Sequence, residues 1–233
     1  MADSTQRRRL LAAAVSGVAL GLPMIAASAA DKGKASSDAW HVRVEVPGDV
    51  TIGTGERPSV KIDAEPGVRD KIQASINGHS IDIHTTGSFQ TQQPIRITVV
   101  AGPVGRLEVM GTTAAMLSGA TAPILTAVVG DTASLALSDV NLDQLSLDIR
   151  GSAGVQASGS ATQQHLKLAD AASFDGSELS GDVVRAELSG SSDAAVAARS
   201  KLQAKVRDAA GLTYRGEPQI ESSVQDAGSL SSE

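Results

Sequence analysis

The sequence predicts an all-β protein: a right-handed parallel β-helix that begins with an antiparallel, hairpin-rich portion. Three observations lead to this prediction. A phrase of small residues returns every 18 to 21 residues through the second half of the chain. Each copy follows a short segment in which apolar residues alternate with polar ones. The chain has only four aromatic residues among 233, and a thin core of stacked aliphatic side chains does not need the large rings that normally fill a globule of this size.

The start of the chain has the pattern of an export signal. Three consecutive arginines, residues 7–9, precede an uncharged and mostly apolar run that extends to Ala30. A pattern of small residues suits cleavage between Ala29 and Ala30. We therefore expect residues 1–29 to be a signal peptide and residues 30–39 a linker. The protein would then be exported, and would be periplasmic, secreted or attached to the cell surface.

The sequence leaves the type of signal open. Paired arginines followed by apolar residues resemble a twin-arginine signal, whereas a basic start before an apolar run also suits the general secretory route. An uncleaved membrane anchor is a third reading, but the run is rich in Ala and Gly and therefore only weakly hydrophobic. We expect a cleaved signal and no stable membrane insertion after cleavage.

Charge and composition exclude several classes of partner and chemistry. The net charge is −6, and loss of residues 1–29 would leave 17 basic and 25 acidic side chains of the original 20 and 26, a net charge near −8. Such a protein gains nothing from counterion release on a polyanion, so we expect no nucleic-acid partner. The chain has no cysteine, which excludes thiol catalysis, cysteine-ligated metals and a lipoprotein anchor.

Residues 40–106 are expected to form an N-terminal β region that covers one end of the solenoid. Alternating valines in the segment 41–46 predict a strand with one apolar face, and Pro-Gly-Asp at 47–49 predicts a turn. Asn77-Gly78, between two alternating segments, is the strongest short signal for a β-hairpin. Tight turns between short strands suggest a region that leans towards antiparallel pairing.

Residues 107–233 carry the repeat, and we expect residues 40–233 to form one continuous domain. A constant period near 20 residues predicts units that bury their apolar faces only against their neighbours. The Asn ladder of a leucine-rich repeat is absent, whereas Gly, Ser, Ala and Asp suit the tight corners of a β-helix. The copies start at Met110, Val129, Arg150, Ala169, Ser189, Arg207 and Gln225.

One segment has a local preference that conflicts with the repeat. Residues 193–210 are rich in Ala, Lys, Arg and Leu, which favours a helix. The phase of the repeat instead places Leu202, Ala204 and Val206 where earlier copies have inward strand residues. We predict a strand.

The segment from Val184 to Pro218 resembles a bacterial family called the putative autotransporter adhesin head GIN domain, an exported domain of unknown function. The resemblance covers about residues 40–230, although several Gly-Ser-Gly corners are replaced by Asp-Ala. It implies a β-helical head in a periplasmic or cell-surface protein with an adhesin-like role and no catalytic residues. The residues that match the family motif are Ser189, Gly190, Asp193, Tyr214, Gly216 and Pro218.

The histidines offer one candidate site. His79 and His84 would point to opposite faces of a strand, whereas Asp82 and His84 would share a face and could begin a metal or acid–base site. Without a third ligand or a nucleophile, we expect a solvated strand face. We expect His41 and His165 at the surface or in turns.

Aspartates recur near the corners of the repeats. A ladder of carboxylates could bind Ca²⁺, but the nonapeptide of calcium-binding β-rolls is absent and single turn aspartates usually bond their own backbone. We therefore predict no metal and no cofactor. The aspartates concerned are Asp131, Asp170, Asp193, Asp208 and Asp226.

A parallel β-helix can also act on polysaccharides. That activity would require paired carboxylates, or aspartates with an arginine base, on one outer face. Asp148 and Arg150 share a strand face, as do Arg185 and Glu187, and Lys205 and Arg207 sit on a later coil. We expect these residues to form an ordinary charged outer face.

The sequence therefore predicts an exported, non-enzymatic binding or scaffold module, an adhesin-like head of unknown ligand. The alternative is a periplasmic β-helix that acts on or binds polysaccharide. With only Trp40 and Tyr214 as larger amphipathic rings, an aromatic sugar-binding platform is poorly supported. The last repeat has Leu230 as its only large apolar residue, which predicts either a polar cap or self-association through the end of the solenoid.

Overall fold

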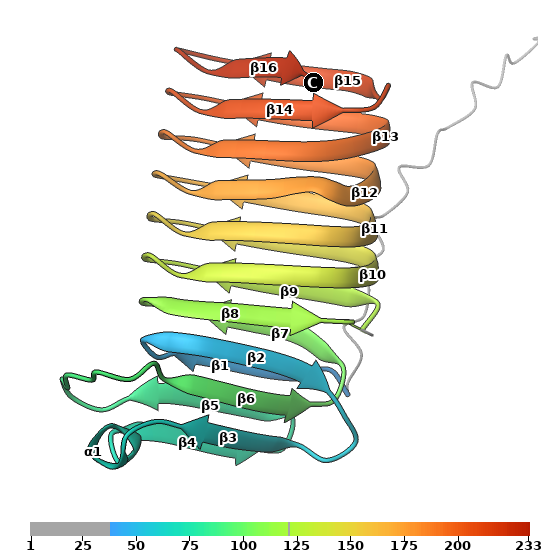
Figure 1. Cartoon of the computed structure of the whole chain (residues 1–233). Helices are drawn as coiled ribbons and strands as arrows, with labels where there is room; N and C mark the ends of the chain where they lie inside the picture. The colour runs from blue at the N-terminus through green and yellow to red at the C-terminus, as the bar shows by residue number, and fades with distance from the viewer. Residues whose placement is uncertain (1–37, 121) are drawn as a thin grey trace, which may run out of the picture. The chain divides into compact units, whose positions relative to one another are not determined.

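The computed structural model of the chain describes residues 38–120 and 122–233. The expected signal peptide, with its cleavage site at Ala29 and Ala30, lies outside the described residues. The described part is a β-solenoid, shown as a stack of coils in Figure 1. Its strands are β1 (Trp40–Glu45), β2 (Gly48–Thr54), β3 (Ser59–Asp63), β4 (Ile72–Asn77), β5 (Ser80–Thr85), β6 (Arg96–Ala101), β7 (Val104–Val109), β8 (Thr113–Ser118), β9 (Ile124–Val129), β10 (Ser134–Ile149), β11 (Gly154–Leu168), β12 (Ser173–Leu188), β13 (Asp193–Val206), β14 (Gly211–Arg215), β15 (Gln219–Val224) and β16 (Ser229–Ser232).

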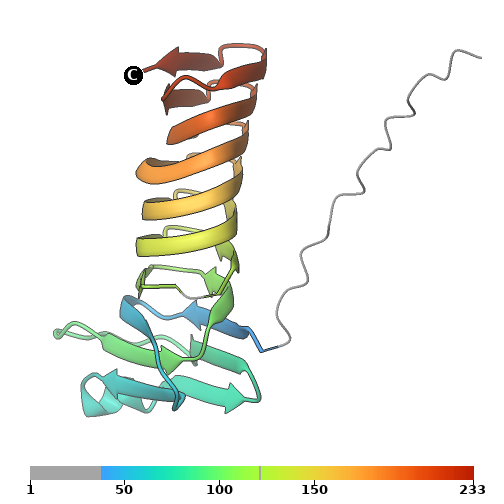
Figure 2. The same ribbon diagram turned by 90° about the vertical axis from the view of Figure 1, so that its right-hand side faces the viewer.

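Each coil places one strand on each of two faces. Face A contains β4, β5, β1, β7, β9, the second halves of β10 to β13, and β15, in that spatial order. Face B contains β3, β6, β2, β8, the first halves of β10 to β13, then β14 and β16. The long strands β10 to β13 bend between the two faces, as Figure 2 shows from the side. All pairs in the repeat region are parallel, which confirms the predicted parallel β-helix.

The core consists of ladders, in which side chains at equivalent positions of successive coils stack on one another. Because side chains alternate along a strand, every second residue points between the two faces. On face A, Ile149 stacks on Val129 and Leu168, and the ladder continues to Leu188 and Val206. All five are at most 1% exposed. Each ladder removes aliphatic surface from water along the whole stack, which is how a chain with four aromatic rings builds a core.

The first coil is inserted between coils that come later in the chain. β1 pairs in parallel with β5 on one side and β7 on the other, and β2 lies likewise between β6 and β8. Figure 1 shows this blue coil between two green ones. The expectation of antiparallel pairing was therefore wrong for β1 and β2. The turn at 47–49 joins strands on opposite faces, and an alternating pattern has the same period in parallel and antiparallel sheets.

Antiparallel strands do close the N-terminal end, as predicted. β4 and β5 form the hairpin at Asn77-Gly78, and β3 runs antiparallel to β6. The short helix α1 (Pro66–Arg69) connects β3 and β4, and its Val68 is 3% exposed. Among the described residues, none lies in a helix with the length and apolarity that crossing a membrane would require.

The strand that the repeat phase predicted for the segment with helical composition is confirmed. Residues 193–206 form β13, a strand in which Leu202, Ala204 and Val206 are buried. Burial of these side chains against their neighbours in the ladders stabilises the strand more than helix formation would stabilise the isolated segment. Local helix propensity is a weak preference that tertiary burial overrides.

Candidate functional site

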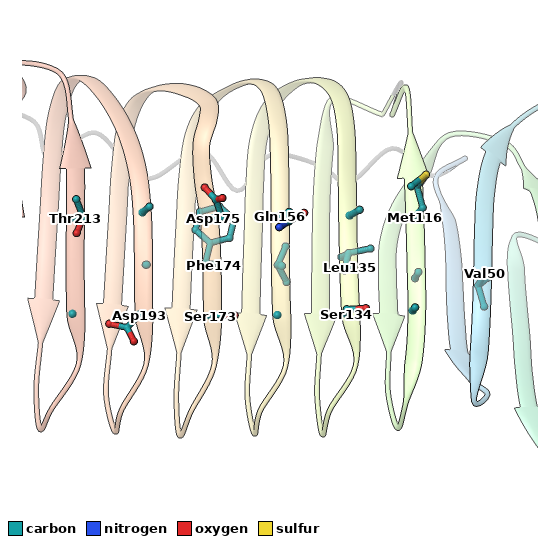
Figure 3. A pocket seen from close by; sticks show the side chains of 18 of the residues that line it. Val50, Met116, Ser134, Leu135, Gln156, Ser173, Phe174, Asp175, Asp193 and Thr213 are labelled. Atoms are coloured by element: carbon teal, nitrogen blue, oxygen red, sulfur yellow. The ribbon is translucent and has the colours of Figure 1, made fainter. Parts of the chain in front are cut away.

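An open groove runs along the outer surface of face B. It crosses β2, β8, the first halves of β10 to β13, β14 and the start of β16, and its volume is about 810 Å³. Figure 3 shows the strands of successive coils side by side along this surface. The groove therefore follows the axis along which the coils stack and is built from one small contribution per coil.

Two outward rows form the floor of the groove, and they contain mostly Ala, Ser, Gly and Thr. Small side chains here leave the backbone close to the surface. The largest apolar side chain is Met116, which is 47% exposed. The first row is Asp49, Ala114, Ser134, Gly154, Ser173, Asp193, Gly211 and Ser229, and the second is Thr51, Met116, Ala136, Gln156, Asp175, Ala195 and Thr213.

The groove is acidic or neutral along its length. Its ionisable lining residues are Asp49, Asp175 and Asp193, and its lining includes no Lys, Arg or His. The carboxylate of Asp175 accepts hydrogen bonds from the hydroxyl and the backbone N–H of Ser177, at 2.7 and 3.2 Å. A surface of this kind attracts basic ligands, does not repel neutral ones, and disfavours phosphates and other polyanions.

The outer surface of face A has the opposite character, because its charges alternate in sign. Lys205 pairs with Glu187 on the preceding coil at 2.8 Å. Arg150, which directly follows β10, donates two hydrogen bonds to Asp148 of that strand, at 2.6 and 2.7 Å. One outward row reads Asp82, Arg43, Glu108, Val128, Asp148, Lys167, Glu187 and Lys205.

The neighbouring charges hold these carboxylates in their ionised form. Partial burial raises the pKa of Glu108, but the hydrogen bond and charge of Arg106, with His41 and Arg43, outweigh it and leave the pKa below its ordinary value. The hydrogen bond from Lys205 lowers the pKa of Glu187. Neither carboxyl has the raised pKa that a general acid requires.

A chain of polar contacts extends over the C-terminal coils of face A. Arg185 donates to Gln203 at 2.5 Å, and Gln203 donates to Glu221 at 2.6 Å. The carboxylate of Glu221 also pairs with Lys201 at 2.8 Å. Burial, and then the charge of Arg185, lower the pKa of His165. These contacts link three coils and leave each charge with a partner of its own chain.

The structure places Asp82 and His84 side by side on β5, as the sequence predicted. Nδ1 of His84 lies 2.7 Å from Oδ1 of Asp82, and His79 points away and packs edge-on against Trp40, with ring centroids 5.3 Å apart. His41 lies 3.3 Å from Glu108. Within residues 38–120 and 122–233 there is no group of three or more His, Asp or Glu side chains suited to hold a metal ion.

Three of the corner aspartates, Asp131, Asp170 and Asp208, bond to a neighbouring coil, so the expectation that they bond their own turn was wrong for these three. Asp131 accepts a hydrogen bond from the backbone N–H of Gly111 on the preceding coil, at 2.9 Å. Asp170 and Asp208 make the equivalent bonds to other corner glycines, at 3.1 and 2.9 Å. Asp193 does not lie at a corner: it begins β13 and faces the groove.

The residues of the family motif lie at two structural positions. Ser189 and Gly190 form a corner, where Gly190 has φ +78°. Tyr214 stacks on Val196 at the C-terminal end of the core. Gly216 has φ +105°, and a Cβ at this position would clash with the carbonyl oxygen of Ala198. Pro218 immediately precedes β15. Except for Asp193, none of the motif residues lines the groove.

Sequence reasoning missed the groove on face B. Its signal is present in the repeats: the outward position directly after each corner is Ala114, Ser134, Gly154, Ser173 or Asp193 in successive copies. Such small residues suggest turns when they are read in sequence order. Only the register of the coils places them in one continuous row.

Comparisons with known proteins agree with this architecture. A family model described as "Putative auto-transporter adhesin, head GIN domain" matches residues 41–218. A putative adhesin from Bacteroides fragilis is 15% identical, with a TM-score of 0.73 over 84% of this chain and 93% of its own. A putative lipid binding protein from Parabacteroides distasonis is 13% identical, with a TM-score of 0.69 over 84% and 93%.

A third structure, a putative adhesin from Parabacteroides merdae, is 13% identical, with a TM-score of 0.61 over 84% of this chain and 92% of its own. At these identities the likeness shows the fold. No curated protein matches the chain.

Proposed function

Because the chain belongs to the putative auto-transporter adhesin head GIN domain family, we propose that it is an exported, non-enzymatic binding module that holds its ligand in the groove of face B. The observation that carries the proposal is the groove itself, a continuous surface of small side chains about 810 Å³ in volume. A pocket of this size is within the range of ligand sites in proteins. The module would act in the periplasm or at the cell surface.

The lining of the groove suggests the class of ligand. An extended chain could lie along the stack and meet the same small residues on each coil. The hydroxyls of Ser134, Ser173 and Thr213 and the carboxylate of Asp175 offer hydrogen bonds, and Met116 and the alanines offer apolar contact. A neutral polymer such as a cell-surface polysaccharide combines hydroxyls with apolar patches and carries no charge for the acidic groove to repel.

Two further observations support a binding role over catalysis. Charged groups on face A pair with one another, as Arg150 does with Asp148 and Lys205 with Glu187. These carboxylates are therefore not free to contact a substrate. The solved structures of similar fold are described as putative adhesins and, in one case, as a putative lipid binding protein. We therefore propose that the protein has no enzymatic activity.

The test is a pull-down of the purified protein with insoluble polysaccharides, peptidoglycan, whole cells and vesicles of neutral lipid. We expect saturable binding to one polysaccharide-containing material. The variant Ala136→Arg places a long side chain in the groove and should reduce the bound fraction at least tenfold.

Ser146→Arg is the matched control, because Ser146 lies on the same strand β10 but faces outward on face A. It should bind like the unmodified protein. Binding that survives Ala136→Arg, or no binding to any of the materials, would contradict the proposal.

A further inference from the structure

The last coil leaves one side of two strands without a partner. In the described part of the chain, β15 pairs only with β13 and β16 pairs only with β14. All six residues of β15 are exposed. Unpaired backbone N–H and C=O groups along such an edge form a template on which another strand can pair.

The apolar interior is also open at this end. Ile220 and Val224 continue the ladders of Leu202 and Val206, which are fully buried. Ile220 and Val224 are nevertheless 40% and 43% exposed. The opposite end of the stack differs, because Val68 of α1 is 3% exposed there. Of the inward positions of β15, only Ser222 is polar, so this strand does not supply a complete polar cap.

We propose that this end is a self-association surface, on which a second copy of the chain docks about a two-fold axis. A two-fold axis normal to the faces keeps face A of one copy on the same side as face A of the other and reverses the strand direction. β15 then runs antiparallel to the partner's β15, and β16 meets the partner's β16. The two cores become continuous across the interface.

The sequence of β15 selects a register. In an antiparallel pair, directly opposed residues point to the same face, so inward residues must oppose inward residues. A register centred on Ser222 satisfies this condition and opposes residues 220–224 of the two copies. It sets Ile220 against the partner's Val224, and the small Ser222 against its own counterpart. The register centred on Glu221 meets the same condition, but it sets the two Glu221 carboxylates against each other, and registers centred on Ile220 or Val224 pair half of the strand or less.

Charge does not oppose this pairing. The single charged residue of β15 is Glu221, which faces outward and is already engaged with Lys201 and Gln203 of its own chain. In the proposed register it lies opposite the partner's Ser223. β16, Ser-Leu-Ser-Ser, carries no charge. Proteins commonly protect edge strands with lysine or other charges, and β3 at the other end of the stack contains Lys61 and Asp63.

The geometry also limits the assembly to two copies. The two ends of the stack are different, and a two-fold contact uses the same end of both copies, so it closes on itself. The contact consists of two short strands and a few side chains, and it is therefore a small interface of the weak or transient class. Association should depend on protein concentration over the range of a sedimentation experiment.

Sedimentation equilibrium of the purified protein over a wide concentration range tests the proposal. We expect the mass to rise from that of the monomer to twice that value. Ile220→Lys should weaken dimerisation at least tenfold, because it places an ammonium group in the apolar contact. The double variant Ile220→Lys/Val224→Glu should restore part of the association, because each lysine then opposes a glutamate of the partner subunit.

Ile76→Lys and Met116→Lys are matched controls, since Ile76 and Met116 are 42% and 47% exposed but lie in the N-terminal cap and in the groove. Neither should change the association. Circular dichroism should show the same strand content in all variants. A protein that stays monomeric at every concentration would overturn the proposal, and so would a dimer that Ile220→Lys leaves intact or that the Met116 control disrupts.

Discussion

At the scale of single residues, the corners of the coils depend on an alternation of glycine and aspartate. Six successive corners are Gly111, Asp131, Gly151, Asp170, Gly190 and Asp208, and all six have φ between +59° and +78°. Asp tolerates this conformation better than most residues do, and Gly adopts it without cost. Asp226 at the last corner breaks the alternation.

The alternation has a steric and a polar cause. A Cβ on Gly151 would lie 2.6 Å from the carbonyl oxygen of Asp131, and a Cβ on Gly190 would lie 2.6 Å from that of Asp170. The same glycines donate their N–H groups to the next aspartate along the stack. Glycine is therefore required at the corners of Gly151 and Gly190, and the aspartate above each supplies the acceptor.

We predict that Gly151→Ala destabilises the protein by about 3 kcal/mol or more, because it combines a left-handed backbone with a clash against a backbone atom. Gly78→Ala is the matched control. Gly78 has φ +57° but nothing within 4 Å of its absent Cβ, so only the backbone cost of about 1 kcal/mol applies. Urea unfolding followed by circular dichroism measures both. Equal losses would show that the close approach to Asp131 has no energetic weight.

At the scale of elements, a large side chain is accommodated by a glycine on the same strand or on the adjacent one. Phe174 on β12 fills the space left by Gly176 two residues later, where a Cβ would lie 2.5 Å from its ring. Gln164 on β11 occupies an inward position between Leu145 and Val184 and is fully buried. A Cβ on Gly181 of the adjacent strand would lie 2.5 Å from the amide of Gln164.

The buried amide of Gln164 is only partly satisfied. Its Nε2 donates to the carbonyl oxygen of Leu179 at 3.3 Å, whereas its Oε1 has no hydrogen-bond partner among the described residues. A buried acceptor without a partner costs more than a modest hydrogen bond returns. An apolar side chain of similar size would fill this inward position without burying an unpaired polar atom.

We therefore predict that Gln164→Leu stabilises the protein by about 1 kcal/mol. The control is Gln163→Leu, since Gln163 is an exposed neighbour on the same strand and should change stability little. Thermal unfolding by calorimetry measures both variants. A clear loss of stability in Gln164→Leu would mean that the amide oxygen has a partner, such as a bound water.

At the scale of the whole described domain, stability is approximately a sum over coils and over the contacts between neighbouring coils. The glycine–aspartate alternation makes two coils, and not one, the repeating unit of the stack. The pairs Phe174 with Gly176 and Gln164 with Gly181 also lie within the two coils from residue 151 to residue 189. Removing both coils keeps the glycine–aspartate alternation and takes out both of these pairs intact, whereas removing one coil does not.

We predict that deletion of residues 151–189 yields a cooperatively folded protein, because Gly190 then replaces Gly151 above Asp131. Deletion of residues 151–169 should be much less stable, although it removes fewer residues. It sets Asp170 against Asp131, where a Cβ has no room, and it leaves Gly181 without Gln164. Urea unfolding compares the two deletions, and equal stability would contradict the two-coil repeating unit.

The sequence by itself determined the repeating coil, the parallel stack, the positions of the corners and the inward ladders. These properties follow from residue types at fixed spacing: an apolar residue that recurs once per coil must stack on its counterparts, and small residues must turn the chain. The strand β13, whose isolated composition favours a helix, shows that this periodic information exceeds local propensity.

Only the tertiary structure decided which coil lies beside which, and this information fixes every surface feature. An alternating strand such as β1 has the same pattern whether its neighbours are parallel or antiparallel, so its place between β5 and β7 could not be predicted. The groove of face B exists only once the register aligns residues such as Ala136 and Ala195. Ile220 and Val224 are inward residues by pattern, and they become a contact surface only because no further strand lies over β15 among the described residues.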